Sequence, residues 1–177
     1  MASLIATWGV ASVLALLGQA LWRLTPLALE PWRNGSMSTL QQVLYVLWVA
    51  IMAYSEGYRG FQKKFSPRVV ARAFYLGRHP TPLRVLFALP FCMSFFHSTR
   101  RQRIVSYTFV TLIALLVVAV RHLPQPWRGI VDGGVVVGLA WGAVAIVVFY
   151  VRGLRGRPPP VPDLPHAGPP SEASARV

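Results

Sequence analysis

Long apolar blocks alternate with short basic loops along most of the chain. Four blocks of 17 residues or more are nearly free of charge: 3–22, 39–58, 104–120 and 130–151. At about 1.5 Å of rise per residue, a helix of about 20 residues reaches roughly 30 Å, the thickness of the hydrocarbon core of a bilayer. A soluble core does not need apolar runs of this length. The pattern therefore predicts four membrane-spanning helices.

A fifth apolar segment, 85–97, has only 13 residues and carries Pro90 near its middle. Apolar runs this short are more often re-entrant or interfacial than spanning, and a proline inside a helix costs about 3 kcal/mol. If the segment spanned, the Lys and Arg residues would divide 9 to 9 between the two sides of the membrane. If it returns to its own side, they divide 14 to 4, as the positive-inside rule requires. We therefore expect a short re-entrant or interfacial hairpin, with both termini cytoplasmic.

The residues between the second and third spans, 59–103, then form a long cytoplasmic segment. The pair Ser66-Pro67 is a typical helix start and Gly77 a typical stop, so the pattern predicts a helix over 67–76. Its apolar side chains share one face and its arginines lie beside that face, which is typical of a helix in the plane of the lipid headgroups. A short helix packed on the protein's own cytoplasmic end explains the pattern almost equally well.

The end of the chain differs from the rest in composition. Residues 156–177 (GRPPPVPDLPHAGPPSEASARV) are dense in proline and poor in large apolar side chains. Such a segment buries too little surface to fold, so we expect a disordered cytoplasmic tail behind a transmembrane helical domain of residues 1–155. The predicted fold class is all-α: a polytopic membrane protein, built as a four-helix transmembrane bundle with a cytoplasmic interfacial helix and a short hairpin.

The charge balance indicates what the cytoplasmic side contacts. The chain carries 18 Lys and Arg residues against 5 Asp and Glu, a net charge of +13. In a soluble protein this excess would suggest nucleic acid, but no base-reading motif accompanies it. In a membrane protein it indicates anionic headgroups on the cytoplasmic side, so we expect anionic membrane lipids as partners and no nucleic acid. The candidate lipid- or partner-binding residues are Arg59, Lys63, Lys64, Arg68 and Arg72.

Three polar residues lie inside predicted spans and are candidates for function at membrane depth. Glu56 has Arg59 three residues later, so an interfacial ion pair is the simpler explanation of its presence. Asp132 has Arg128 four residues earlier, again a ready partner. Gln19 lies deep in the first span, where a hydrogen bond to another helix is the expected role.

The last span contains a regular row of small residues. Gly134, Gly138 and Gly142 are spaced by four, so they form one groove along a helix. Such a groove lets another helix approach closely by van der Waals packing. The partner is either a span of the same chain or another subunit, so a homo-oligomer or a larger membrane complex stays open.

The sequence contains little that would support catalysis or bind a cofactor. Cys92 is the single cysteine, and no two histidines are spaced as metal or haem ligands in a bundle. No HExxH, GxSxG or glycine-rich phosphate loop occurs. We therefore expect no catalytic residues, no metal and no cofactor.

The functional hypothesis is a non-catalytic scaffold or accessory subunit of a membrane complex. The alternatives are a small channel or transporter, for which a re-entrant hairpin is a common element, and an enzyme that acts on lipid. The scarcity of lysine and the abundance of Ala, Val, Gly and Pro are typical of a GC-rich bacterial gene. A multi-pass protein of the bacterial inner membrane is the predicted location.

Overall fold

The computed structural model describes residues 2–95, 100–157 and 159. Of these residues 86% are helical, and no strand occurs among them. The all-α fold class is therefore confirmed. In chain order the elements are α1 (Ala2–Arg33), α2 (Thr39–Met52), the π-helical stretch η1 (Ala53–Phe65), α3 (Ser66–Arg78), α4 (Pro82–Leu86), α5 (Ala88–Cys92), α6 (Arg100–Arg121) and α7 (Trp127–Leu154).

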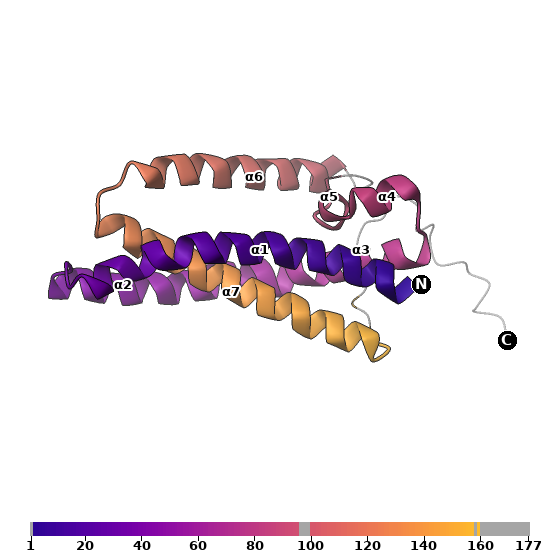
Figure 1. Cartoon of the computed structure of the whole chain (residues 1–177), viewed down its shortest axis with the longest axis horizontal. Helices are drawn as coiled ribbons and strands as arrows, with labels where there is room; N and C mark the ends of the chain where they lie inside the picture. The colour runs from indigo at the N-terminus through magenta and orange to yellow at the C-terminus, as the bar shows by residue number, and fades with distance from the viewer. Residues whose placement is uncertain (1, 96–99, 158, 160–177) are drawn as a thin grey trace.

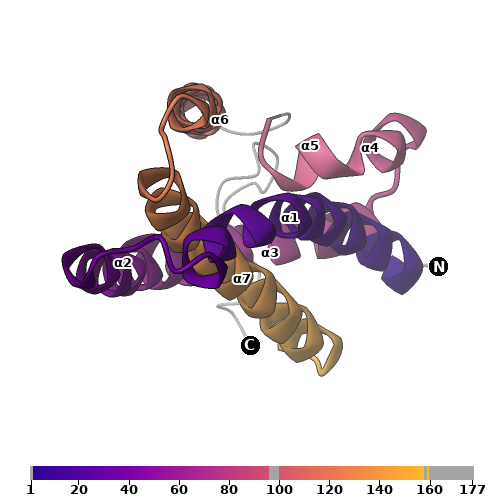
Figure 2. The same cartoon turned by 60° about the vertical axis from the view of Figure 1, so that its left-hand side comes forward.

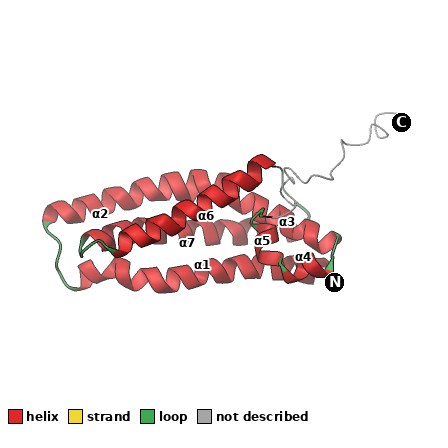
Figure 3. Ribbon diagram, turned by 90° about the horizontal axis from the view of Figure 1, so that it is seen from above, coloured by secondary structure: helices red, strands yellow, loops and turns green. Residues whose placement is uncertain are grey.

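The long helices run side by side between two ends of the molecule (Figures 1 and 3). The end that holds the N-terminus, here called the proximal end, also holds α4, α5, the end of α3 and the end of α7 (Figure 1). The opposite, distal end holds the turn from α1 to α2 and the turn from α6 to α7 (Figure 1). Each predicted apolar block lies in one of these long helical stretches.

The helix that starts at Thr39 does not end where the second span was expected to end. Residues 39–78 are helical throughout, as α2, η1 and α3 in succession, and the backbone stays right-handed at both junctions. The residues 59–78 therefore do not lie in a separate loop. Hydropathy predicts where apolar side chains stop, but helical hydrogen bonds continue past charged side chains without cost.

The predicted helix 67–76 exists within α3, but it is not an interfacial helix. Val69, Val70, Ala73 and Leu76 are buried at 1% exposure or less, packed on α1 and α7. The expectation of a helix in the headgroup plane is therefore wrong, and the packed alternative describes α3. Ser66 caps nothing, since the chain enters α3 already helical; its hydroxyl instead donates to the carbonyl oxygen of Gly142 at 3.3 Å.

The first helix is also longer than its apolar block. It continues past Trp22 to Arg33 with Pro26 and Pro31 inside it. Each proline removes one backbone donor, but the helix is supported at this point by its neighbour. Pro31 is buried and packs against Gly129 at the start of α7.

The hairpin segment is two short helices, α4 and α5, broken at Phe87. Each has five residues, about 7 Å of helix, which is too short to cross a bilayer. Ala88, Phe91 and Cys92 are buried against α1 and α3, and the indole of Trp8 donates to the carbonyl oxygen of Val85. Residues 96 and 97 of the predicted hairpin, like most of the predicted tail, lie outside the described residues.

The core lies between α1, α3, α5 and α7 (Figure 2). Helix α6 stands apart from it and joins the other helices chiefly at its turn into α7 (Figures 1 and 2). Many large apolar side chains of α2 and α6 are exposed, including Val46, Ile51, Leu115 and Val118 at 56–63%. Helices α1 and α7 are each long and apolar enough to cross a membrane.

Candidate functional site

The glycine groove of α7 is filled by the helix that runs from α2 into η1. A Cβ on Gly134 would meet the indole of Trp48, and one on Gly142 would meet the ring of Phe61. At Gly138 the nearest atoms are the Cβ and Oε2 of Glu56, both 3.3 Å from the position a Cβ would take. The partner in the groove is therefore a helix of the same chain.

These contacts place η1 beside the middle of α7 rather than beyond its end. The indole of Trp141 reinforces the alignment, since its Nε1 donates to Oε1 of Gln62 at 2.8 Å and its ring packs on Gly57. Glu56 and the basic residues that follow it therefore lie level with the apolar centre of α7. Charged side chains at such a level are costly in a membrane and usually have a function there.

The π-helical winding of η1 decides which of these side chains share a face. A π-helix is built on i→i+5 hydrogen bonds, so residues four to five apart line up, and π-helical turns are frequent at functional sites. Glu56, Gly60, Lys64 and Arg68 lie along one face of η1 and α3, since a spacing of four aligns residues in either winding, whereas residues three apart no longer face each other in a π-helix. Arg59 falls outside this row, and among the described residues the expected ion pair of Glu56 with Arg59 does not form.

A cavity of about 360 Å³ opens along this face, between η1, α3, the end of α5 and α6. It combines charged groups with an apolar wall. Its lining residues are Ser55, Glu56, Gly60, Phe61, Lys64, Phe65, Arg68, Val69, Cys92, Met93, Ser94, Phe95 and Val110.

Gly60 forms an open part of the cavity wall. A Cβ added there would meet only the carbonyl oxygen of Ser55, at 3.5 Å, which is ordinary van der Waals contact. The space in front of Gly60 is therefore empty of side chains, and the glycine leaves the gap between Glu56 and Lys64 open. The sequence places Gly57 and Gly60 on either side of Arg59, and glycines beside a basic residue let a headgroup approach closely. Only Gly60 leaves such a space, because Gly57 packs on Trp141.

Ser94, on the opposite wall, has an unusual backbone conformation. Its φ of 66° lies in the left-handed region, and it ends α5 in a Schellman motif: Ser94 N donates to Phe91 O and Phe95 N donates to Pro90 O. Glycine is the usual residue at this position, because any side chain there is strained. A buried serine at this point brings a hydroxyl-bearing side chain to the cavity, and such strain is often found at functional sites.

Arg72 lies one turn beyond this row and is buried, at 1% exposure. Its Nε donates to the carbonyl oxygen of Phe91 at 2.7 Å, and its guanidinium lies 4.6 Å from the centroid of the Phe91 ring. Burial lowers the pKa of Arg72 to about 10, and burial raises the pKa of the adjacent Cys92 thiol to about 12. A buried arginine does not contact headgroups at the surface, so the expected lipid-binding role of Arg72 is wrong, and the residue joins α5 to α3 instead.

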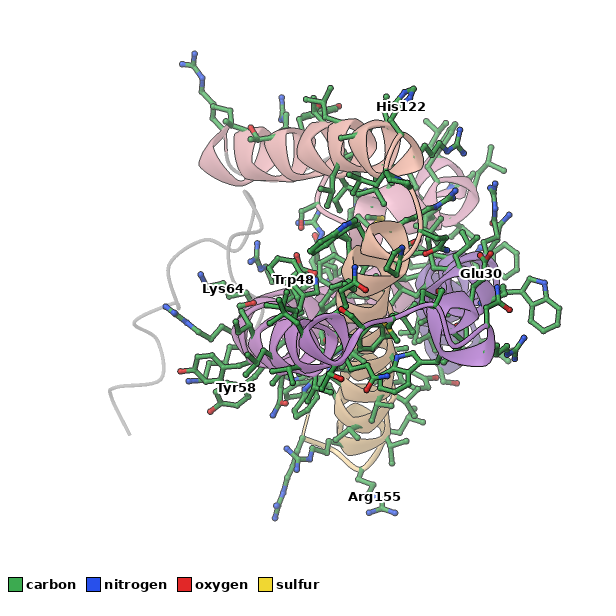
Figure 4. All side chains as sticks on the ribbon, turned by 90° about the vertical axis from the view of Figure 1, so that its left-hand side faces the viewer. Glu30, Trp48, Tyr58, Lys64, His122 and Arg155 are labelled. Carbon is green, nitrogen blue, oxygen red and sulfur yellow. The ribbon has the colours of Figure 1, made fainter. Side chains whose placement is uncertain are left out.

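The other four basic residues differ in exposure. Arg59, Lys63 and Lys64 are exposed, and Arg68 is half-buried with its Nε donating to the carbonyl oxygen of Lys64 at 2.8 Å. Figure 4 shows Lys64 and Tyr58 pointing outward from the helix, on the side away from α1. The ammonium of Lys63 lies over the ring of Tyr58, 4.6 Å from its centroid.

The remaining polar candidates lie away from the cavity. Asp132 pairs with Arg128, with 3.6 Å between Oδ2 and Nε, as the spacing of four predicts. Beside it Gln125 donates to Glu30 at 2.9 Å and accepts from the backbone N–H of Gly129, which ties the end of α1 to the start of α7. Asp132 therefore has a structural explanation.

Gln19 does not make the expected contact. Its side chain is exposed on α1, and no hydrogen bond to another helix forms within the described part of the chain. The interhelical hydrogen bond predicted for it is absent because Gln19 lies on the outer face of α1.

No group of three or more His, Cys, Asp and Glu side chains gathers as a potential metal site in residues 2–95 and 100–157. Comparison with protein-family models, with curated proteins and with solved structures gives no match to this chain.

Proposed function

We propose that the chain is a four-span protein of the bacterial inner membrane that acts as a non-catalytic scaffold or accessory subunit and docks anionic lipid through the basic residues of η1 and α3. The observation that carries the proposal is a group of exposed basic side chains, Arg59, Lys63 and Lys64, on a helix that is packed among apolar helices. The spans of this proposal are α1, α2 with η1, α6 and α7.

The surface of the bundle supports a lipid environment. In the most apolar window of α1 and of α7 only 28% of the residues are buried inside the structure, so neither is a core helix of the kind that a soluble protein buries. Apolar side chains exposed all along α2 and α6 are stable in hydrocarbon and unstable in water.

The charges at the two ends support an orientation with the proximal end in the cytoplasm. Basic residues at the proximal end include Arg78, Arg84, Arg152 and Arg155. The distal end has Arg33, Arg121 and Arg128. Cytoplasmic retention of Lys and Arg favours the side that carries more of them.

The exposed basic residues of η1 support lipid docking, in addition to any part they have in setting the orientation of the protein in the membrane. Arg59, Lys63 and Lys64 are exposed and have long flexible side chains, and such side chains bury their apolar stems while their charged ends extend towards lipid headgroups. Each basic residue near an anionic leaflet contributes about 1 kcal/mol of attraction. Three such residues bring about 3 kcal/mol, enough to enrich anionic lipid around one side of the bundle.

The test is lipid co-purification in mild detergent, followed by mass spectrometry of bound lipids and proteins. The wild-type protein should retain anionic lipid, and Arg59→Glu with Lys63→Glu should clearly lower the enrichment of anionic over neutral lipid. Arg33→Glu with Arg121→Glu is the matched control, because it makes the same charge change at the distal end. Unchanged enrichment in the Arg59 and Lys63 double variant would refute the proposal. Ion or solute flux through the protein in proteoliposomes would favour the channel or transporter alternative instead. Chemical turnover of the added lipid would favour the enzyme alternative.

A further inference from the structure

We propose that the cavity between η1, α3, α5 and α6 binds one molecule of an anionic phospholipid whose headgroup carries hydroxyls, with phosphatidylglycerol as the type. This inference rests on the proposed function, because it needs the bundle to lie in a membrane. It goes further, since it assigns one defined site with named contacts in place of a diffuse basic surface.

The positive side of the cavity fits a phosphate. Lys64 and Arg68 lie one turn apart on the face that lines the cavity. The Nε of Arg68 is held by the carbonyl oxygen of Lys64, which orients the guanidinium and leaves its terminal nitrogens to bind a ligand. A guanidinium beside an ammonium is a typical phosphate site, because charge-assisted hydrogen bonds to phosphate oxygens are short and strong.

The apolar side of the cavity fits an acyl chain. Phe61, Phe65 and Val69 line it from η1 and α3, while Met93, Phe95 and Val110 line it from the α5 end and α6. A volume of about 360 Å³ lies at the lower end of the range for small-ligand sites. It accommodates a headgroup with the first part of a chain, and the rest continues into the bilayer between α6 and the other helices.

Glu56 decides which headgroup the cavity accepts. Glu56 is half-buried and lines the cavity two turns before Lys64, with the open space of Gly60 between them. A carboxylate accepts hydrogen bonds, so it favours a headgroup with hydroxyl donors beyond the phosphate. Choline offers no such donor, and its cation, although attracted to Glu56, is repelled by both Lys64 and Arg68. A bare phosphate monoester brings more negative charge towards Glu56. A glycerol headgroup satisfies both the basic residues and the carboxylate.

The experiment fills the cavity without changing its charges. Gly60→Leu places a side chain in the open space, where a Cβ meets no closer atom than 3.5 Å. Gly18→Leu is the matched control, because a Cβ at Gly18 on α1 meets nothing within 4 Å. Each protein is reconstituted in nanodiscs of equal parts phosphatidylglycerol and phosphatidylcholine. The protein is then released from the nanodisc in the mass spectrometer, and the lipid molecules still bound to it are counted.

The wild-type protein and Gly18→Leu should each retain one phosphatidylglycerol, and Gly60→Leu should lose that occupancy at least tenfold. Retention in Gly60→Leu equal to wild type overturns the cavity site. If Gly60→Leu retains lipid like the wild type but Arg59→Glu with Lys63→Glu lowers the retention of anionic lipid, the cavity site is wrong and the proposed function stands. Retention of neither lipid by the wild-type protein overturns both.

Discussion

The side chain of Arg72 joins two segments that are far apart in the sequence, because its Nε donates to the carbonyl oxygen of Phe91 at 2.7 Å and its guanidinium stacks over the Phe91 ring. Phe91 belongs to α5, which packs on α1 and α3 at the proximal end. This contact holds α5, and with it Ser94, against the helix that carries the basic residues of the cavity. This buried arginine therefore helps to hold one wall of the cavity in place.

Arg72→Ala should destabilise the protein strongly. The variant loses a hydrogen bond from a charged donor and a buried cation–π contact, together about 3 kcal/mol in the free energy of unfolding. Arg72→Lys should recover little of it, because an ammonium does not reproduce the planar guanidinium. Thermal unfolding in detergent measures the effect, with the exposed Arg59→Ala as control. Similar midpoints for Arg72→Ala and Arg59→Ala would contradict the assigned role.

The loss of stability caused by a substitution in the glycine groove should depend on the space available at each position. Gly138→Ala should cost less than about 1 kcal/mol, because Glu56 needs to shift only slightly. Gly134→Ala and Gly142→Ala should cost about 1–3 kcal/mol each, since the new Cβ overlaps Trp48 or Phe61. Val137→Leu, on a neighbouring face, is the control for added volume. Equal costs at the three glycines, measured by thermal unfolding, would mean that the groove is not packed as described.

The strained backbone of Ser94 predicts an unusual order of stability. Ser94→Gly and Ser94→Ala both remove the hydroxyl, but only glycine relieves the left-handed conformation at φ 66°. The glycine variant should therefore be more stable than the alanine variant by about 1 kcal/mol. Chemical denaturation of the two variants tests this difference. An alanine variant as stable as the glycine variant would show that the position carries no strain.

Cys92 should be unreactive in the folded protein. With the pKa of its thiol raised to about 12 and 1% of the residue exposed, little thiolate forms near neutral pH and no reagent reaches it. N-ethylmaleimide should label it only after unfolding. As the pH rises above about 8.5, the unfolded chain loses the thiol proton that the folded chain keeps, so this residue's contribution to stability declines. Cys92→Ala should flatten the decline between pH 7 and pH 9.5; labelling of the folded protein at pH 7 would contradict the burial.

The apolar pattern of the sequence predicted the long helices well, because runs such as 130–151 have few stable alternatives to a helix. It also predicted the ion pair of Arg128 with Asp132, which depends only on local helical spacing. The break in 85–97 followed from its length and from Pro90. These features are encoded by residues close together in the chain.

The cavity was not predictable from the sequence, because its walls come from three separate parts of the chain. The assumed pairing of Glu56 with Arg59 required α-helical winding, in which residues three apart are neighbours, and the π-helical winding of η1 turns Arg59 away from Glu56. Periodicity also identified the apolar face of α3 without identifying what covers it. Helix α1 covers that face, and this leaves Arg72 in the core.

The most direct test of the account is the orientation of the bundle in intact cells and in inverted membrane vesicles. In a Cys92→Ala background, single cysteines replace His79 and Gly156 at the proximal end and Asn34 and His122 at the distal end. A membrane-impermeant maleimide should label the distal pair only from the periplasm and the proximal pair only from the cytoplasm. Labelling of all four positions from one side, or recovery of the protein in the soluble fraction, would contradict the membrane-spanning bundle on which the lipid site depends.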